Sequence, residues 1–313
     1  MDCDDLAMLL AVREARALGR DEVARLREHV AQCESCRALA AAPYQLLGEL
    51  ARGGMGRILR AHDHRNGHDV AIKEVLGGGP TARARFAREI SITTRLQHPA
   101  IVPIYEAGEW PDGTPFYAMR LVTGGTLAAA IARAQDRMAL LPHVVAAAEA
   151  LAYAHTQRIV HRDVTPKNIL VGELGETIVI DWGLAKDLDA ADGDPMTPAL
   201  TSTGDVMGTP GFLSPEQAAG DDADERSDVY AVGAILYALC AGHPPYWSTG
   251  RTPTPTRLLE LVRAGPPASL AVLAPTVPAQ LHAIAERAMA REPVARFASM
   301  KALVDALRAA TPR

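Results

Sequence analysis

The chain has 313 residues, 48 % of them hydrophobic, which is enough for one large domain, of one or two lobes, and a short appendage. Its formal net charge of −5 argues against nucleic acid binding, which usually requires a basic excess. The acidic start, MDCDDLAMLL, is unlike a secretory signal, and the apolar runs Val144–Ala154 and Val229–Ala241 are too short to span a membrane. We therefore expect a soluble, cytoplasmic protein that binds no membrane.

Residues 1–42 are charged and Ala-rich, with helical periodicity, and they contain the stretch HVAQCESC from His29 to Cys36. On a helix, His29, Cys33 and Cys36 share one face, and Cys3 supplies a fourth ligand for tetrahedral zinc if the chain folds back. Two alternatives stay open, namely structural cysteines beside a surface histidine, or a thiol–disulfide sensor.

After Pro43, the pattern changes to short β-type runs that surround one helix-like stretch, Thr81–Leu96. From Leu127 onward, the pattern predicts helices, apart from short strands near Ile169–Val171 and Thr177–Ile180. The span Leu188–Gly211 lacks periodicity and is rich in Asp, Thr, Pro and Gly, which predicts a long functional loop. The β-type runs before Leu127 are YQLLGEL, DVAIKEV, AIVPIYEAG and PFYAMRLV.

A glycine-rich segment, LARGGMGRI from Leu50 to Ile58, lies between two of these predicted strands. Glycines let backbone amides approach a phosphate, although a plain hairpin turn has the same composition. In the following strand, Lys73 lies among apolar residues, where a lysine needs an acidic partner. Glu89 borders the inward stripe of the next helix and is the predicted partner; the alternative is a Lys73 that extends to solvent.

Two polar clusters follow, IVHRDVTPKNIL from Ile159 to Leu170 and VIDWGLA from Val179 to Ala185. Asn168 and Asp181 offer the oxygen ligands that Mg²⁺ prefers beside substrate phosphates. Asp163 is left to accept a hydroxyl proton. For either cluster alone, a structural aspartate in a loop is the competing interpretation.

Taken in order, these motifs resemble the protein kinase family, in particular the bacterial eukaryotic-like Ser/Thr kinases. The resemblance extends from Tyr44 to about Arg308. It implies an α+β, two-lobed kinase fold over residues 43–310, preceded in the sequence by the helical segment 1–42. The small lobe would comprise about 43–121 and the large lobe about 122–310. It rests on the glycine-rich segment, Ala71-Ile72-Lys73, His161-Arg162-Asp163, Asn168, Asp181-Trp182-Gly183, GTPGFLSPEQ at Gly208–Gln217, Asp228 and Arg296.

The resemblance implies transfer of the γ-phosphoryl group of ATP to Ser or Thr of protein substrates, with Asp163 as catalytic base. Lys73, paired with Glu89, would hold the α- and β-phosphates, and Asn168 and Asp181 would bind Mg²⁺. Further residues implied at the ATP site are Leu50, Ala51, Gly53, Gly54, Gly56, Ile58, Ala71, Met119 as gatekeeper, Arg120 and Val122 in the hinge, and Leu170. Glu216 is expected to pair with Arg296, and Asp228 to brace the catalytic loop.

The chain departs from the family pattern at three positions. Ala51 replaces the first glycine of the loop, and Trp182 replaces the usual Phe as another large apolar anchor. Thr165 stands where Ser/Thr kinases carry a Lys that reaches the transferred phosphate, and its loss removes charge stabilisation that Lys167 would have to supply. This departure keeps a second hypothesis open, a catalytically silent nucleotide-binding scaffold.

Two regulatory features are also expected. Arg162 can pair with a phosphate on the loop before SPE, and autophosphorylation is predicted at Thr201 or Thr203, whereas Thr209 would seat the substrate hydroxyl. Residues 1–42 resemble the zinc-finger segment of anti-sigma-type regulators, which implies a bound zinc and a regulatory protein partner.

Overall fold

The structure is a computed structural model that describes residues 24, 25, 28, 29, 32, 33, 43–53, 56–77, 79–190, 210–247 and 253–310. The chain divides into two compact units, of which the first comprises 1–52 and 58–72 and the second 53–57 and 73–313. Within the described ranges, none of the helices combines the length and the apolar character needed to cross a membrane.

The first unit is built from β-strands that turn around a polar corner. Asp63 ends the second strand with 3 % of its surface exposed, and its carboxylate accepts hydrogen bonds from the backbone of Arg65 at 2.9 Å and from Asn66 Nδ2 at 2.9 Å. Gly67 closes the turn with φ of 70°, a conformation that favours glycine. The strands are β1 (Tyr44–Arg52), β2 (Gly56–Asp63) and β3 (His68–Val75), with order β1-β2-β3; β3 runs on into the second unit.

The second unit begins with a small sheet part and one long helix. β5 (Pro115–Arg120) follows β3 in strand order and pairs antiparallel with the edge strand β4 (Ile104–Glu109). Helix α4 (Pro80–Arg95) begins with Pro80, a favourable first position, and matches the helix predicted at 81–96. Its buried residues are Phe86, Glu89, Ile92 and Thr93, so a glutamate lies on the inward face, as predicted.

Two short antiparallel arrangements place the polar motifs. In the three-stranded sheet, β6 (Gly124–Thr126), β8 (Ile169–Gly172) and β9 (Thr177–Val179) lie in the order β6-β8-β9. β7 (Ile159–Val160) pairs with β10 (Lys186–Asp187). The sequence pattern predicted only the strands near 169 and 177 in this region, because two-residue strands such as β7 and β10 are too short to show alternation.

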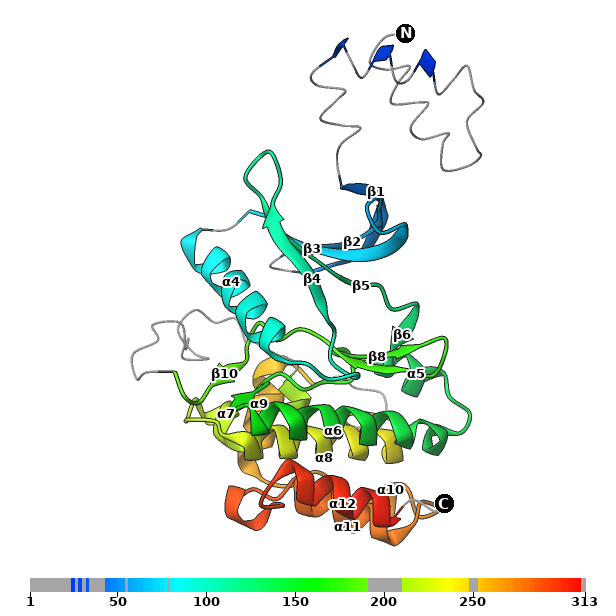
Figure 1. Cartoon of the computed structure of the whole chain (residues 1–313). Coiled ribbons are helices and arrows are strands. Elements are labelled where there is room, and N and C mark those ends of the chain that lie inside the picture. The colour runs from blue at the N-terminus through cyan, green and yellow to red at the C-terminus, as the bar shows by residue number, and fades with distance from the viewer. Residues whose placement is uncertain are drawn as a thin grey trace. The chain divides into compact units, whose positions relative to one another are not determined.

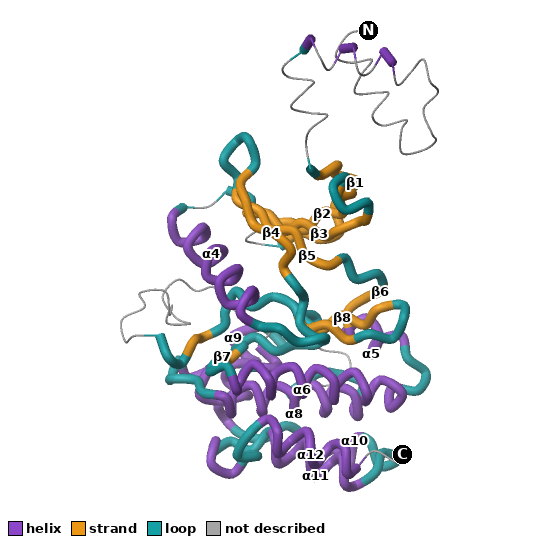
Figure 2. Tube along the Cα trace, viewed as in Figure 1, coloured by secondary structure: helices purple, strands orange, loops and turns teal. Residues whose placement is uncertain are grey.

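Helices form the rest of the second unit, and Figures 1 and 2 show α6 and α8 running side by side with α11 and α12 beneath them. The residues of α8 from Ser227 to Cys240 are buried on all sides, and those after Asp228 are mostly apolar, as expected of a central core helix. The helices are α5 (Leu127–Arg133), α6 (Leu141–Thr156), α7 (Pro215–Ala219), α8 (Glu225–Ala241), α9 (Pro255–Ala264), α10 (Leu270–Leu273), α11 (Ala279–Ala288) and α12 (Met300–Ala310), with 3-10 turns at Arg137–Leu140, Pro210–Phe212 and Pro293–Ala295.

Candidate active site

The loop His161–Asn168 is held by a buried carboxylate of the core helix α8. Asp228 accepts hydrogen bonds from the backbone N–H groups of His161 and Arg162, both at 2.9 Å, and from His155 Nε2 at 2.8 Å. Burial alone would raise the pKa of Asp228, but the hydrogen bond from His155 and the backbone donors outweigh it, so the pKa lies below its ordinary value. The ionised Asp228 therefore braces this loop, in the position expected from the sequence.

Arg162 lies in the left-handed region, with φ of 67°. A non-glycine residue reaches this region only where its surroundings hold it there. Here the two backbone N–H groups meet Asp228 on one side, while Gln217 Nε2 donates to the Arg162 carbonyl at 2.8 Å on the other. These contacts hold the backbone at Arg162 and thereby set the position of the next residue, Asp163.

The carboxylate of Asp163 is oriented on one side only. Asn168 Nδ2 donates to Asp163 Oδ2 at 3.0 Å and to the Asp163 carbonyl at 2.9 Å. The other carboxylate oxygen, Oδ1, is buried, and the described part of the chain offers it no hydrogen-bond donor. Burial, helped by the negative charges of Asp181 and Asp228, raises the pKa of Asp163 to about 6.

The β8–β9 hairpin brings Asn168 and Asp181 together. Ile169 lies opposite Val179, and the backbone N–H of Ile180 donates to the Asn168 carbonyl at 2.9 Å. Asn168, directly before β8, therefore lies close to Asp181, two residues after β9. Asp181 has φ of 65°, a second left-handed non-glycine residue in the same cluster.

Lys73 at the end of β3 joins this cluster through two carboxylates. Its Nζ lies 2.6 Å from Glu89 Oε1 and 3.2 Å from Asp181 Oδ1, so the ion pair predicted between Lys73 and Glu89 is present. Burial opposes the lysine charge, but Glu89 and Asp181 outweigh it and raise the pKa of Lys73. For Asp181 burial is likewise outweighed by Lys73, and its pKa is lowered. Lysine and aspartate are both charged at neutral pH.

Tyr117 of β5 also contacts Glu89, a contact that no sequence pattern predicted. Its hydroxyl donates to Glu89 Oε1 at 2.8 Å, while its ring stacks on Phe86 with 5.2 Å between centroids. Helix α4 is therefore fastened to β5 at the residue that orients Lys73. A tyrosine in a strand is normally predicted to pack in the core. Only the tertiary structure, which places the Tyr117 hydroxyl beside Glu89, identifies this contact.

Trp182 is a buried apolar anchor, as the sequence suggested. It is 1 % exposed, and its ring lies 4.6 Å from that of His161 between centroids. Its Nε1 is buried and has no acceptor among the described residues. An unsatisfied buried N–H costs about 1–3 kcal/mol, a penalty that Phe at this position would not carry.

Thr165 is buried, at 3 % exposure, and its carbonyl accepts the Asn168 N–H at 3.0 Å. It therefore shapes the turn into Asn168 but supplies no charge. Lys167 is exposed, on the opposite side of Pro166 along the chain.

Beyond the cluster, Arg296 forms the ion pair expected with Glu216, with both guanidinium–carboxylate distances at 2.7 Å. Of the residues expected around the nucleotide, Leu50, Ala51, Ile58 and Ala71 belong to the first unit, and Gly54 lies outside the described residues. The second unit contains the remainder, namely Gly53, Gly56, Met119, Arg120, Val122 and Leu170.

The other predicted sites fall largely outside the described residues. Thr201 and Thr203 lie there, as do Cys3 and Cys36. The backbone N–H of Cys33 donates to the His29 carbonyl at 2.9 Å, which is the contact of a helical turn. In the part of the chain that is described, His, Cys, Asp and Glu residues nowhere gather in a group of three that could hold a metal ion.

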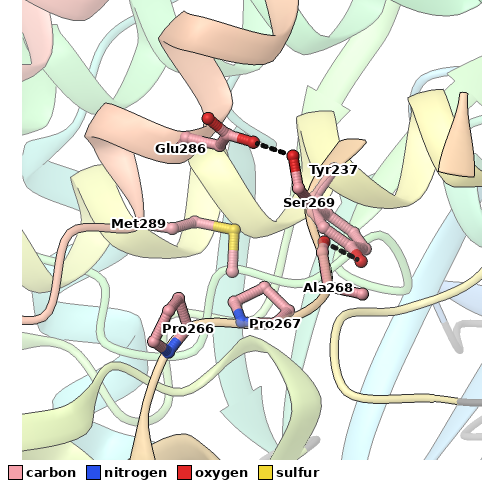
Figure 3. Close-up of a pocket in the computed structure, with 7 residues that line it drawn as sticks. All are labelled: Tyr237, Pro266, Pro267, Ala268, Ser269, Glu286 and Met289. Atoms are coloured by element: carbon pink, nitrogen blue, oxygen red, sulfur yellow. Dashed lines mark hydrogen bonds between the residues drawn. The ribbon is translucent and has the colours of Figure 1, made fainter. Parts of the chain in front are cut away.

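A separate hollow of about 310 Å³ lies in the helical part of the second unit, between α8, the loop before α10, and α11 (Figure 3). Two prolines and Met289 line it, and its polar groups bond to one another. Tyr237 donates to the Ala268 carbonyl at 2.8 Å, and Ser269 Oγ to Glu286 Oε1 at 3.0 Å. None of the residues of the polar cluster lines this hollow.

Comparisons with known proteins agree with this geometry. The DNA damage-responsive serine/threonine-protein kinase RqkA of Deinococcus radiodurans is 38 % identical over 214 residues, which are 66 % of this chain and 31 % of RqkA. The serine/threonine-protein kinase PknL of Mycobacterium tuberculosis is 35 % identical over 275 residues, which are 85 % of this chain and 65 % of PknL. The chain thus spans less than two thirds of either relative.

The crystal structure of the Mycobacterium tuberculosis PknI kinase domain is similar in fold. It matches with a TM-score of 0.61 and 27 % sequence identity, and the match covers 86 % of this chain and 96 % of that domain. The α+β kinase fold predicted from the motifs is therefore confirmed. Residues 44–306 match the family described as the protein kinase domain, and the chain belongs to the protein kinase family.

Proposed function

We propose that this chain is an ATP-dependent serine/threonine protein kinase. The observation that carries the proposal is the state of Asp163, whose Oδ2 is occupied by Asn168 while its buried Oδ1 has no donor among the described residues. A buried acceptor without a donor is costly, and a hydroxyl group of a substrate would satisfy it. The names of the relatives RqkA and PknL agree with this assignment.

In the proposed reaction, the hydroxyl oxygen of a protein Ser or Thr attacks the γ-phosphorus of ATP. The bond from that phosphorus to the β,γ-bridging oxygen breaks, ADP leaves, and the hydroxyl proton passes to Asp163. With a pKa of about 6, Asp163 is mostly ionised at neutral pH and can accept it. Lys73, kept charged by Glu89 and Asp181, would hold the α- and β-phosphates.

The glycine-rich loop with Gly53, Gly54 and Gly56 would cover the phosphates with its backbone amides. Asn168 and Asp181 suit Mg²⁺, because both are oxygen donors and the pKa of Asp181 is lowered. Bound Mg²⁺ would neutralise charge on the β- and γ-phosphates. For the adenine we propose Ile58, Ala71 and Leu170 with Leu50 and Ala51, Met119 as gatekeeper, and the hinge Arg120–Val122.

Arg162 supports regulation by phosphorylation of Thr201 or Thr203. Burial lowers the pKa of Arg162, and the positive charge of Arg88 on α4 lowers it further. Two guanidinium groups that repel each other are favourable neighbours for a phosphate. We therefore infer that autophosphorylation in this loop joins α4 to the loop of Asp163.

A radiolabelled ATP assay tests the proposal with the native chain and Asp163→Asn, which keeps the shape of the side chain but removes the base. We expect incorporation into the native chain and a generic Ser/Thr protein, reduced at least 100-fold in the variant. Equal incorporation in both would contradict the proposal and favour a silent nucleotide-binding scaffold. Mapping of the labelled peptides should place phosphate on Thr201 or Thr203, and label found only elsewhere would contradict the regulatory part.

For the N-terminal segment we propose a zinc site of Cys3, His29, Cys33 and Cys36 that docks a regulatory protein. The proposal is supported by the spacing of these residues and by the helical turn between His29 and Cys33. Metal analysis should find about one zinc per chain, lost in the Cys33→Ser/Cys36→Ser variant. A metal-free native chain whose thiols oxidise reversibly would instead indicate a redox sensor.

A further inference from the structure

Glu74, the residue after Lys73, is a buried carboxylate bound from two directions. Arg57 Nε donates to its Oε1 at 2.5 Å, and Trp110 Nε1 donates to its Oε2 at 2.8 Å. The Glu74 side chain is 5 % exposed, whereas that of Arg57 is 33 % exposed. Each oxygen thus has a donor from a different segment, one from the start of β2, directly after the glycine-rich loop, and one from the β4–β5 turn. All three residues belong to the second unit.

Trp110 is a rigid donor. Its ring stacks on the buried Phe116 ring at 4.2 Å between centroids, with 21° between the planes. Its backbone N–H donates to the Thr114 carbonyl at 2.9 Å, and its carbonyl accepts the Gly113 N–H at 2.8 Å. The position of Oε2 is therefore set by a tight turn and a stacked ring pair, and the carboxylate in turn determines where the Arg57 guanidinium can lie.

The backbone of the glycine-rich loop touches the same residue. A Cβ atom on Gly56 would lie 2.1 Å from the Glu74 carbonyl oxygen, so only glycine allows this approach. The carbonyl of Gly56 also accepts the Gly53 N–H at 2.8 Å, which closes the turn of the loop. The end of the loop is thus held against β3 twice, by backbone at Gly56 and by an ion pair at Arg57.

The Arg57–Glu74 ion pair lies next to both groups that are proposed to bind the phosphates. On β3, Lys73 directly precedes Glu74, and its ammonium is the proposed phosphate ligand. On the loop, Gly53–Gly56 directly precedes Arg57, and its amides are the proposed cover of the phosphates. The Arg57–Glu74 ion pair therefore links the two phosphate-binding groups of this half of the site, and a partly buried pair is screened less by water than a surface pair.

We propose that Glu74 is a positioning residue that sets the affinity for the phosphates of ATP. Through Arg57 it holds the end of the glycine-rich loop against β3, the strand of Lys73, and through Trp110 it ties this contact to the β4–β5 turn. This inference rests on the proposed function, since it deepens the account of the same nucleotide site. It predicts that loss of the clamp weakens the binding of ATP, whose phosphates lie under the loop, and leaves the binding of adenosine unchanged.

The test measures the dissociation constants of ATP and of adenosine by calorimetry on the full chain and on Arg57→Met, Glu74→Gln and Trp110→Phe. Trp110→Phe keeps an aromatic ring for stacking on Phe116 but removes the N–H together with part of the indole. In Arg57→Met and Glu74→Gln, we expect ATP to bind about tenfold more weakly, the scale of a charged hydrogen bond, and adenosine to bind as in the native chain. Trp110→Phe should show a smaller shift in the same direction.

Two further variants separate positioning from mere stability. Arg57→Lys retains a cation for Glu74 Oε1 and should recover most of the ATP affinity. Arg60→Met removes a matched ion pair on the same strand, Arg60 to Asp69 at 2.8 Å, and should leave the ratio of the two constants unchanged. Melting temperatures of all variants show whether a loss of ATP affinity comes from unfolding. Because the Arg57 side chain is partly exposed, the Arg57→Met variant should stay folded.

The outcomes are distinguishable from a failure of the proposed function. If Arg57→Met and Arg57→Lys both bind ATP and adenosine like the native chain, the positioning role is wrong, whatever the phosphoryl-transfer assay shows. If both ligands weaken equally in a folded Arg57→Met chain, the role is structural and the proposal is also wrong. If the native chain binds ATP but transfers no phosphate, the function fails while the clamp can still be upheld by the affinity ratio.

Discussion

Asp163 illustrates how the surroundings of one residue set its chemistry. Asn168 orients one oxygen, burial and two neighbouring carboxylates raise the pKa to about 6, and Oδ1 is left as a buried acceptor. By contrast Lys73 and Asp181 stabilise one another's charges, so the pKa of the lysine is raised and that of the aspartate is lowered. Of these three groups, only Asp163 changes its charge near pH 6.

This difference predicts an acid limb in the pH profile. Below its pKa Asp163 is protonated and cannot accept a proton, so kcat/KM should fall about tenfold per pH unit below about pH 6 and level off above it. The measurement is steady-state phosphorylation of a peptide between pH 5 and 8. Binding of ATP at saturating Mg²⁺ over the same range serves as control, because the proposed phosphate ligand Lys73 and the proposed Mg²⁺ ligand Asp181 keep their charges. A profile that is flat down to pH 5 would contradict the role of Asp163.

At the scale of elements, the contact between α8 and α11 depends on one glycine. A Cβ on Gly233 would lie 2.6 Å from Ala288 Cβ and 3.0 Å from Met289 Cγ, so the two helices approach too closely for any other residue. α8 also carries Asp228, about 1.4 turns before Gly233, so the position of this helix affects the loop that Asp228 braces.

Gly233→Ala should therefore destabilise the chain. Alanine is the better helix former by about 1 kcal/mol, but overpacking a tight helix contact costs about 1–3 kcal/mol. We expect a net loss of stability in urea unfolding. Ala288→Gly combined with Gly233→Ala moves the methyl group to the other helix and should restore part of the loss. A more stable Gly233→Ala chain would show that the helices can separate without cost.

At the scale of the whole molecule, Arg296 connects segments that are far apart in the sequence. Its guanidinium is bidentate to Glu216, 80 residues away, and also donates to the carbonyls of Arg226, Ala290 and Arg291. The side chain is 0 % exposed, and burial of the pair is compensated by these donors, which keep the pKa of Glu216 below its ordinary value.

Arg296→Met should lower the free energy of unfolding by about 3–5 kcal/mol, because Glu216 is left with an uncompensated charge. Arg308→Met is the matched control: its pair with Glu149 also joins distant segments but is 63 % exposed on the arginine side, and its loss should cost less than about 1 kcal/mol. Denaturant unfolding of both variants checks this. Similar losses in the two would mean that burial is not what makes the Arg296 pair strong.

Much of the site could be predicted from the sequence, because its polar residues lie in short motifs. His161 to Asn168 is one loop, and Asp181 lies two residues after a strand that pairs with the strand after Asn168. The helix at 80–95 was predictable from its periodicity, as was the inward position of Glu89. Trp182 and Thr165 could be recognised as departures only because the surrounding motif is so regular.

By itself, the sequence determined the family, the order of the motifs and the residues that could carry charge, since these follow from local pattern and residue chemistry. Only the tertiary structure decided that Tyr117 bonds Glu89, that His155 bonds Asp228, and that Arg57 and Trp110 share Glu74. Each of these bonds joins residues 17 to 73 positions apart. The periodicity of a sequence does not predict which distant side chains will come within 3 Å of one another, because that depends on how closely whole helices and strands pack.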